Sequence, residues 1–98
     1  MRFEWDSEKS EANLEEWGFD FAFASSVFDG PTLEKQDRRK DYGELRVAAL
    51  GLADEIVLTV VYTDRLDERG ERIRRIISAR RSNRGERKAY EAAVEEAE

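Results

Sequence analysis

The sequence predicts an α+β protein in which two N-terminal helices precede an antiparallel meander of strands and a C-terminal helix follows. Three observations lead to this prediction. Capped helical patterns lie before residue 30, β-branched runs separated by turns lie between 45 and 80, and helical spacing returns after residue 83. A chain of 98 residues has the length of one domain with one core, so residues 1–98 are expected to form a single unit.

The N-terminal third predicts one strand and two helices. Residues 3–5 alternate in polarity and predict a short edge strand. A helix is expected over 7–17, because Asp6 is suited to cap its start and Gly18 to end it in the left-handed conformation. A second capped helix over 20–28 has apolar side chains at helical spacing, and its aromatic residues are expected in the core.

The middle of the chain predicts a loop and then three strands. The polar segment 35–44 predicts a loop. Strands are expected over 45–52, 56–63 and 72–80, with tight turns between them. The second of these is β-branched and apolar on both faces, which predicts a central strand.

The last element is predicted to be a helix over 84–96. Asn83 and Glu86 have the spacing of a capping box, in which the two side chains satisfy each other's backbone N–H groups. Glu86 is therefore interpreted as a cap rather than as a catalytic base.

Composition excludes several kinds of chemistry. The chain has neither Cys nor His, which removes disulfides, thiolate sites, Ser-His-Asp triads and imidazole acid–base pairs. The acidic residues show no convincing metal-ligand cluster, so no cofactor is expected. The N-terminus lacks the pattern of a signal peptide and no apolar run is long enough to span a membrane, so a cytoplasmic protein is expected.

The charge is unevenly distributed. The net charge of −6 combines an acidic N-terminal half with a basic stretch over 69–88, which contains nine basic residues and two acidic ones. Eight of the nine are arginines, which bind phosphate in planar, bidentate geometry. The run could be a solvated face, but its interleaved isoleucines mean that some arginines share a strand with core residues. A nucleic acid is therefore a candidate partner at one face.

The chain opens with Phe3-Glu4-Trp5-Asp6, followed by Lys9, Asn13 and Gly18, in the pattern F-x-W-D…K…N…G. This pattern resembles that of one known family, the BrnT toxins. The second helix, from Phe21 to Asp29, and the pair Arg46 and Gly51 also resemble family patterns. The most specific matches are Tyr62-Thr63-Asp64-Arg65, Arg75-Ile76-Ile77-Ser78-Ala79-Arg80, and Asn83 with Glu86 and Tyr90. The chain departs from the family where a K-H-G usually ends the first helix, since Glu16-Trp17-Gly18 stands there.

The resemblance implies a RelE-like fold and a toxin of a type II toxin–antitoxin system. Such a toxin is a metal-independent endoribonuclease that cleaves RNA and inhibits translation. Its implied partners are the RNA substrate and a BrnA-like antitoxin, with operator DNA bound only through the antitoxin.

Without His, arginine is the best available group to stabilise the charge of a phosphorane. Arg46, Arg75 and Arg80 are the candidate phosphate clamps, with Tyr62 and Thr63 as the nearest hydroxyls. Strand alternation puts Arg75 and Arg80 on opposite faces unless the strand ends or bulges between them. The candidate RNA-binding residues are Arg74, Ser78, Arg81 and Arg84.

Two other functions remain open at this point. The chain could be a catalytically weak relative that acts mainly as an antitoxin-binding module, which Trp17 and the acidic N-terminal half favour. It could also be a toxin with another target such as gyrase.

Overall fold

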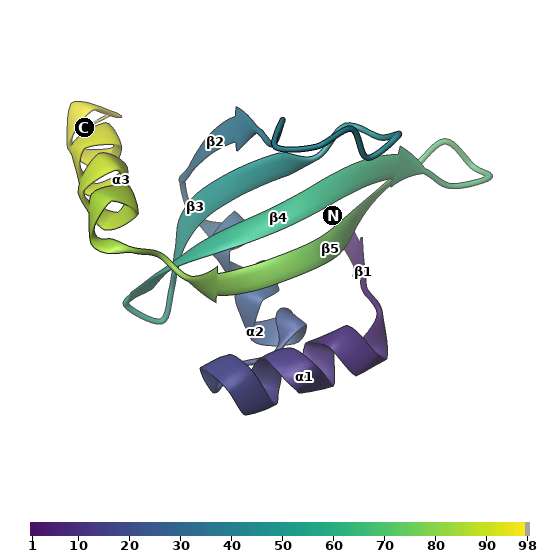
Figure 1. Cartoon of the computed structure of the whole chain (residues 1–98). Helices are drawn as coiled ribbons and strands as arrows, with labels where there is room; N and C mark the ends of the chain where they lie inside the picture. The colour runs from purple at the N-terminus through teal and green to yellow at the C-terminus, as the bar shows by residue number, and fades with distance from the viewer. Residues whose placement is uncertain (98) are drawn as a thin grey trace.

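A computed structural model describes residues 1–97 and shows one five-stranded sheet with helices on both sides (Figure 1). The strands are β1 (Arg2–Glu4), β2 (Thr32–Gln36), β3 (Val47–Ala53), β4 (Ile56–Leu66) and β5 (Arg72–Arg81). The helices are α1 (Ser7–Trp17), α2 (Phe21–Ser25) and α3 (Arg84–Ala97), and the 3-10 turn η1 (Ser26–Asp29) follows α2. The α+β fold class predicted from the sequence is confirmed.

The sheet has the order β1-β5-β4-β3-β2. The strands β2 to β5 form an antiparallel meander, and β1 adds to β5 in parallel. The central place of β4 confirms the prediction made from its apolar sequence. Asp54 and Glu55 join β3 to β4, both with positive φ, as the two-residue hairpin turn requires.

The helix ends follow the capping pattern in the sequence. The Asp6 carboxylate accepts hydrogen bonds from the N–H groups of Glu8 and Lys9, and Gly18 ends α1 with φ 84°. The Phe21 N–H donates to the Ser10 hydroxyl at 3.0 Å, which ties α2 to α1. The last of these bonds fixes the two helices relative to each other.

The core lies between that face and the two N-terminal helices. Phe21, Ala24 and Val27 pack there against inward side chains of β3, β4 and β5. The opposite face is left to α3, which stands at the end of the sheet beside β2 and β3 (Figure 1). Among residues 1–97, no helix has the length and apolar character needed to cross a membrane.

Two predicted elements were wrong in part. The helix expected over 20–28 changes from α2 to the 3-10 turn η1, where the hydroxyls of Ser25 and Ser26 donate to backbone carbonyls one turn back. Such bonds compete with the regular helical ladder. The predicted loop over 35–44 begins inside β2, an edge strand whose mainly exposed polar side chains give no apolar alternation.

A β-bulge in β5 sets which side chains reach each face. Val61 pairs with Ser78 whereas Tyr62 pairs with Ile76, so Ile77 is an extra residue in the ladder. Before Ile77 the odd-numbered side chains of β5 lie on the face of Arg75, and after Ile77 the even-numbered side chains lie on that face. Arg75 and Arg80 consequently lie on the same face, which is the exception that the sequence analysis allowed.

Candidate functional site

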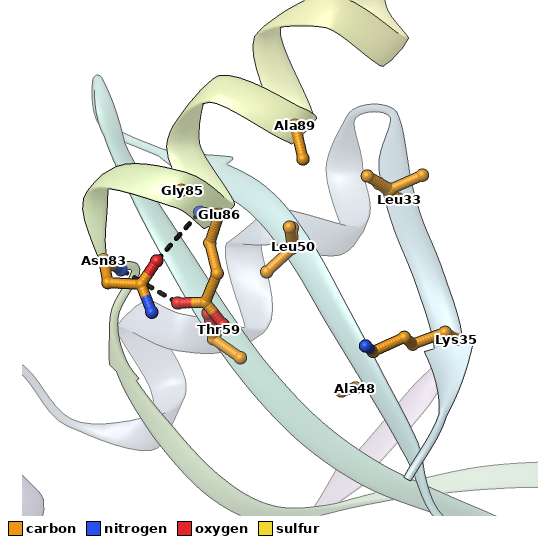
Figure 2. A pocket seen from close by; sticks show the side chains of 9 residues that line it. All are labelled: Leu33, Lys35, Ala48, Leu50, Thr59, Asn83, Gly85, Glu86 and Ala89. Carbon is orange, nitrogen blue, oxygen red and sulfur yellow. Dashed lines mark hydrogen bonds between the residues drawn. The ribbon is translucent and has the colours of Figure 1, made fainter.

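A groove runs along the face of the sheet that α1 and α2 leave uncovered. Its wider part has a volume of about 760 Å³ and contains the side chains of Ser78 and Arg80 from β5. A second recess of about 460 Å³ adjoins it under α3 (Figure 2). The two parts share Thr59 and Glu86 in their walls, so they form one continuous concave surface.

Arg80 and Glu86 form the central charged pair of the groove. Arg80 Nη1 and Nη2 donate to the two Glu86 carboxylate oxygens at 2.7 and 2.9 Å, and Nη1 also lies 3.4 Å from the Arg81 carbonyl oxygen. A guanidinium has five N–H donors. Three are used here, so the Nε–H and the second Nη2–H remain without a partner among residues 1–97. These two donors share one edge of the guanidinium, which is the geometry that binds a phosphate bidentately.

Glu86 has a second role at the start of α3. It accepts the Asn83 N–H at 2.8 Å, and the Asn83 side chain accepts the Glu86 N–H at 2.8 Å, which confirms the predicted capping box. Hydrogen bonding to Arg80 lowers the pKa of Glu86 to about 2. The carboxylate is thus ionised at neutral pH and is a weak base.

A second basic cluster borders the groove and was missed in the sequence. Arg38 and Arg39 follow β2 and line the groove with Lys35. Arg39 is held by Asp37, whose two oxygens accept from Arg39 Nε and Nη2 at 2.9 Å each, and this bonding lowers the pKa of Asp37 to about 2. Arg39 also acts electrostatically on Arg80, whose pKa its charge tends to lower. The sequence feature that could have indicated this cluster is the run Lys35-Gln36-Asp37-Arg38-Arg39-Lys40, which has four basic residues and one acidic residue.

Three predicted site residues, Ser78, Arg75 and Thr63, share this face with Arg80. Ser78 is exposed in the groove wall. Arg75 lies five residues before Arg80, about 15 Å along the strand, with its guanidinium 3.9 Å from the Glu4 carboxylate. Thr63 pairs with Arg75 across the ladder, but its hydroxyl donates to the Leu45 carbonyl at 2.8 Å and the residue is buried.

Arg74 and Tyr62 lie on the opposite face. The Arg74 guanidinium packs on the rings of Phe28 and Tyr62, with its central carbon 4.8 and 3.9 Å from their centroids. It also makes two hydrogen bonds of 2.8 and 2.9 Å to Asp64, and only 10% of its side chain is exposed. The Tyr62 hydroxyl donates to Glu34, and burial raises the pKa of this phenol. These contacts are structural.

The other three predicted arginines lie apart from the groove. Arg81 follows Arg80 but borders a hollow on the α1/α2 side with Leu14 and Phe23. Arg46 packs over the Tyr42 ring at 4.0 Å and pairs with Glu44. Arg84 is exposed in the first turn of α3.

The described acidic side chains form no group of three or more that could hold a metal ion. What the groove offers is a set of fixed cationic donors. The α+β fold thus presents a groove with four cationic side chains, Lys35, Arg38, Arg39 and Arg80, against two carboxylates, Asp37 and Glu86.

The particular family follows from comparison with known proteins. Residues 5–86 match the family described as "Ribonuclease toxin, BrnT, of type II toxin-antitoxin system". The match spans most of the chain, so the chain belongs to the BrnT family of ribonuclease toxins. Membership in a type II system implies an antitoxin partner. A search of curated proteins gives no significant match.

Proposed function

We propose that this protein is a metal-independent endoribonuclease that cleaves RNA in the Arg80 groove and thereby inhibits translation. The observation that carries the proposal is the guanidinium of Arg80, which Glu86 fixes by one edge while a second edge remains available to a phosphate. Family membership supports the same reading. We further propose that the fold is RelE-like, that the protein acts in the cytoplasm, and that a BrnA-like antitoxin neutralises it and supplies the contact to operator DNA.

The proposed reaction is attack of a ribose 2′-oxygen on the adjacent phosphorus, with breakage of the P–O5′ bond. Negative charge develops on the non-bridging oxygens, where Arg80 and Arg39 can stabilise it. Solvent takes the 2′-proton and protonates O5′, because Glu86, with a pKa of about 2, is too weak a base for an efficient transfer at neutral pH. Arg75 is the candidate for a neighbouring phosphate on the same face.

Trp17 occupies the position of the family histidine without removing a group from this groove. Trp17 is partly buried and packs against the core on the α1/α2 side of the sheet. Its role here is packing, and the proposed catalytic charge stabilisation comes from the opposite face.

Two neighbouring arginines provide a matched test. Arg80→Ala removes the groove donor, whereas Arg81→Ala removes the next arginine, which faces the other side of the sheet. We expect the first substitution to lower RNA cleavage by purified protein at least 100-fold and to relieve growth arrest in a bacterial host. The second is expected to change cleavage less than threefold, and thermal melting checks that both variants fold. Loss of cleavage in Arg81→Ala with activity kept in Arg80→Ala would place the site on the α1/α2 face and refute the proposal.

A second candidate function is an antitoxin-binding module with weak or no catalysis. The observation that favours it is again the Arg80–Glu86 pair, because an arginine already neutralised by a carboxylate attracts a phosphate less strongly. This function predicts tight antitoxin binding without toxicity or RNA cleavage. Growth arrest without loss of RNA would instead favour another target, such as gyrase.

A further inference from the structure

The recess under α3 is a pocket with apolar walls. Leu33 from β2, Leu50 from β3 and Ala89 from α3 converge on it (Figure 2). Its volume of about 460 Å³ lies in the range of pockets that hold small molecules. Gly85 also borders it, and a side-chain carbon at Gly85 would contact only the Asn83 side chain, so this wall is open.

The rim of the recess carries hydrogen-bond donors. The Lys35 ammonium and the Asn83 amide lie on opposite sides of it (Figure 2). The Asn83 oxygen accepts the Glu86 N–H, which leaves its amide nitrogen as a donor. The rim therefore favours a flat, apolar group whose edge carries acceptors.

The recess is continuous with the groove that contains Arg80. Glu86 and Thr59 belong to both, and Glu86 holds the Arg80 guanidinium at the junction. A ligand with a phosphate on the outer edge of Arg80 would thus have its neighbouring groups at the mouth of the recess. An unstacked nucleobase has the required flat shape, and proteins hold such bases between apolar side chains while bonding to their edges.

We infer that this recess binds one nucleobase of the RNA, next to the phosphate held by Arg80, and so selects where the RNA is cleaved. The inference rests on the proposed function. Because Lys35 and Asn83 both donate, the preferred base presents acceptors on its edge, as guanine does with O6 and N7. Single-stranded RNA is the substrate class, since a paired base could not enter.

The test uses two alanines of the same helix. Ala89→Leu fills the recess, whereas Ala92→Leu adds the same atoms at an exposed position of α3. Purified wild-type protein is incubated with a single-stranded RNA pool of random sequence, and the cleaved ends are sequenced. We expect the wild type and Ala92→Leu to show the same base preference at one position beside the cut. Ala89→Leu should lose that preference and cleave at least tenfold more slowly, and Lys35→Met should weaken the preference.

Several outcomes would overturn the inference. Cleavage by the wild type without base preference refutes it and leaves the proposed function intact, as does an Ala89→Leu variant with unchanged rate and preference. If Ala89→Leu weakens only antitoxin binding, the recess belongs to a protein partner. If the wild type cleaves no RNA, the proposed function fails. Binding of short RNA oligonucleotides, measured by fluorescence anisotropy, then decides the inference, which requires Ala89→Leu to bind at least fivefold more weakly than Ala92→Leu.

Discussion

Gly51 allows η1 to pack directly on β3. A side-chain carbon at Gly51 would lie 2.7 Å from the Val27 Cβ and 3.2 Å from the Thr32 methyl carbon, closer than such atoms pack. Overpacking of this kind costs about 1–3 kcal/mol, and removal of a glycine from a strand recovers up to about 1 kcal/mol. We therefore expect Gly51→Ala to lower the free energy of unfolding by roughly 1–2 kcal/mol, or Tm by roughly 5–10 °C for a domain of this size.

The assay is urea and thermal unfolding followed by circular dichroism. Gly30→Ala is the matched control, because a side-chain carbon there has no neighbour within 4 Å in the described structure. In a Val27→Gly background the closest contact is removed, because the Val27 Cβ is then absent, so the cost of Gly51→Ala should shrink by at least about 0.5 kcal/mol. An unchanged cost in that background would show that the packing argument is wrong, as would a Gly51→Ala protein as stable as the wild type.

Three other substitutions test the charged and buried groups. Glu86→Gln should keep the capping box but weaken the interaction with Arg80. Folding lowers the pKa of Glu86 from 4.5 to about 2. The contribution of its carboxylate to stability is therefore present above about pH 4.5 and is lost as the pH falls toward 2. The variant should therefore show less acid destabilisation than the wild type across that range in pH-dependent urea melts. Tyr62→Phe should keep full RNA cleavage, and ultraviolet titration of the wild type should show a tyrosine that ionises above the usual pH of 10. Arg74→Met removes two hydrogen bonds to the Asp64 carboxylate, which keeps only Arg72 at 3.9 Å, and should cost about 1.5–3 kcal/mol in chemical unfolding. An equal loss in Asp64→Asn/Arg74→Met would show that the loss of the partner to the carboxylate is not the cause.

The sequence was sufficient for most of the fold because local signals were strong. Asp6, Gly18 and the Asn83 capping box mark helix ends through bonds within a few residues. The strand β2 was missed because it is ordered by distant segments, through its pairing with β3 and the hydrogen bond from Tyr62 to Glu34, and its own polar sequence shows neither. The early end of α2 depends on the hydroxyls of Ser25 and Ser26, which donate to backbone carbonyls. The sequence does not show whether such hydroxyls bond to the backbone or to solvent.

The candidate site was predictable only in part. The basic stretch over 69–88 was visible, and Arg80 was placed correctly at the exit of β5 toward α3. The sequence did not show how the arginines divide between the two faces of the sheet, because Arg74 and Arg80 would share a face in a regular strand. The contribution of the segment 35–39 depends on the pairing of β2 with β3, which places these residues across the groove from Ser78 and Arg80 of β5.

The extra residue at Ile77 decides which of the five arginines of β5 reach the groove face. In a continuous ladder that paired Ile77 with Val61, Ser78 would take the inward position now held by Ala79, which is 3% exposed under the N-terminal helices, and Arg80 would turn away from the groove. The extra residue thus changes the parity of the strand, keeps the small Ala79 in the core and puts Arg80 beside Glu86. Deleting Ile77 would leave a regular ladder with the same partners for Ser78, Ala79 and Arg80, so the side that Arg80 faces depends on how many residues of this segment enter the ladder.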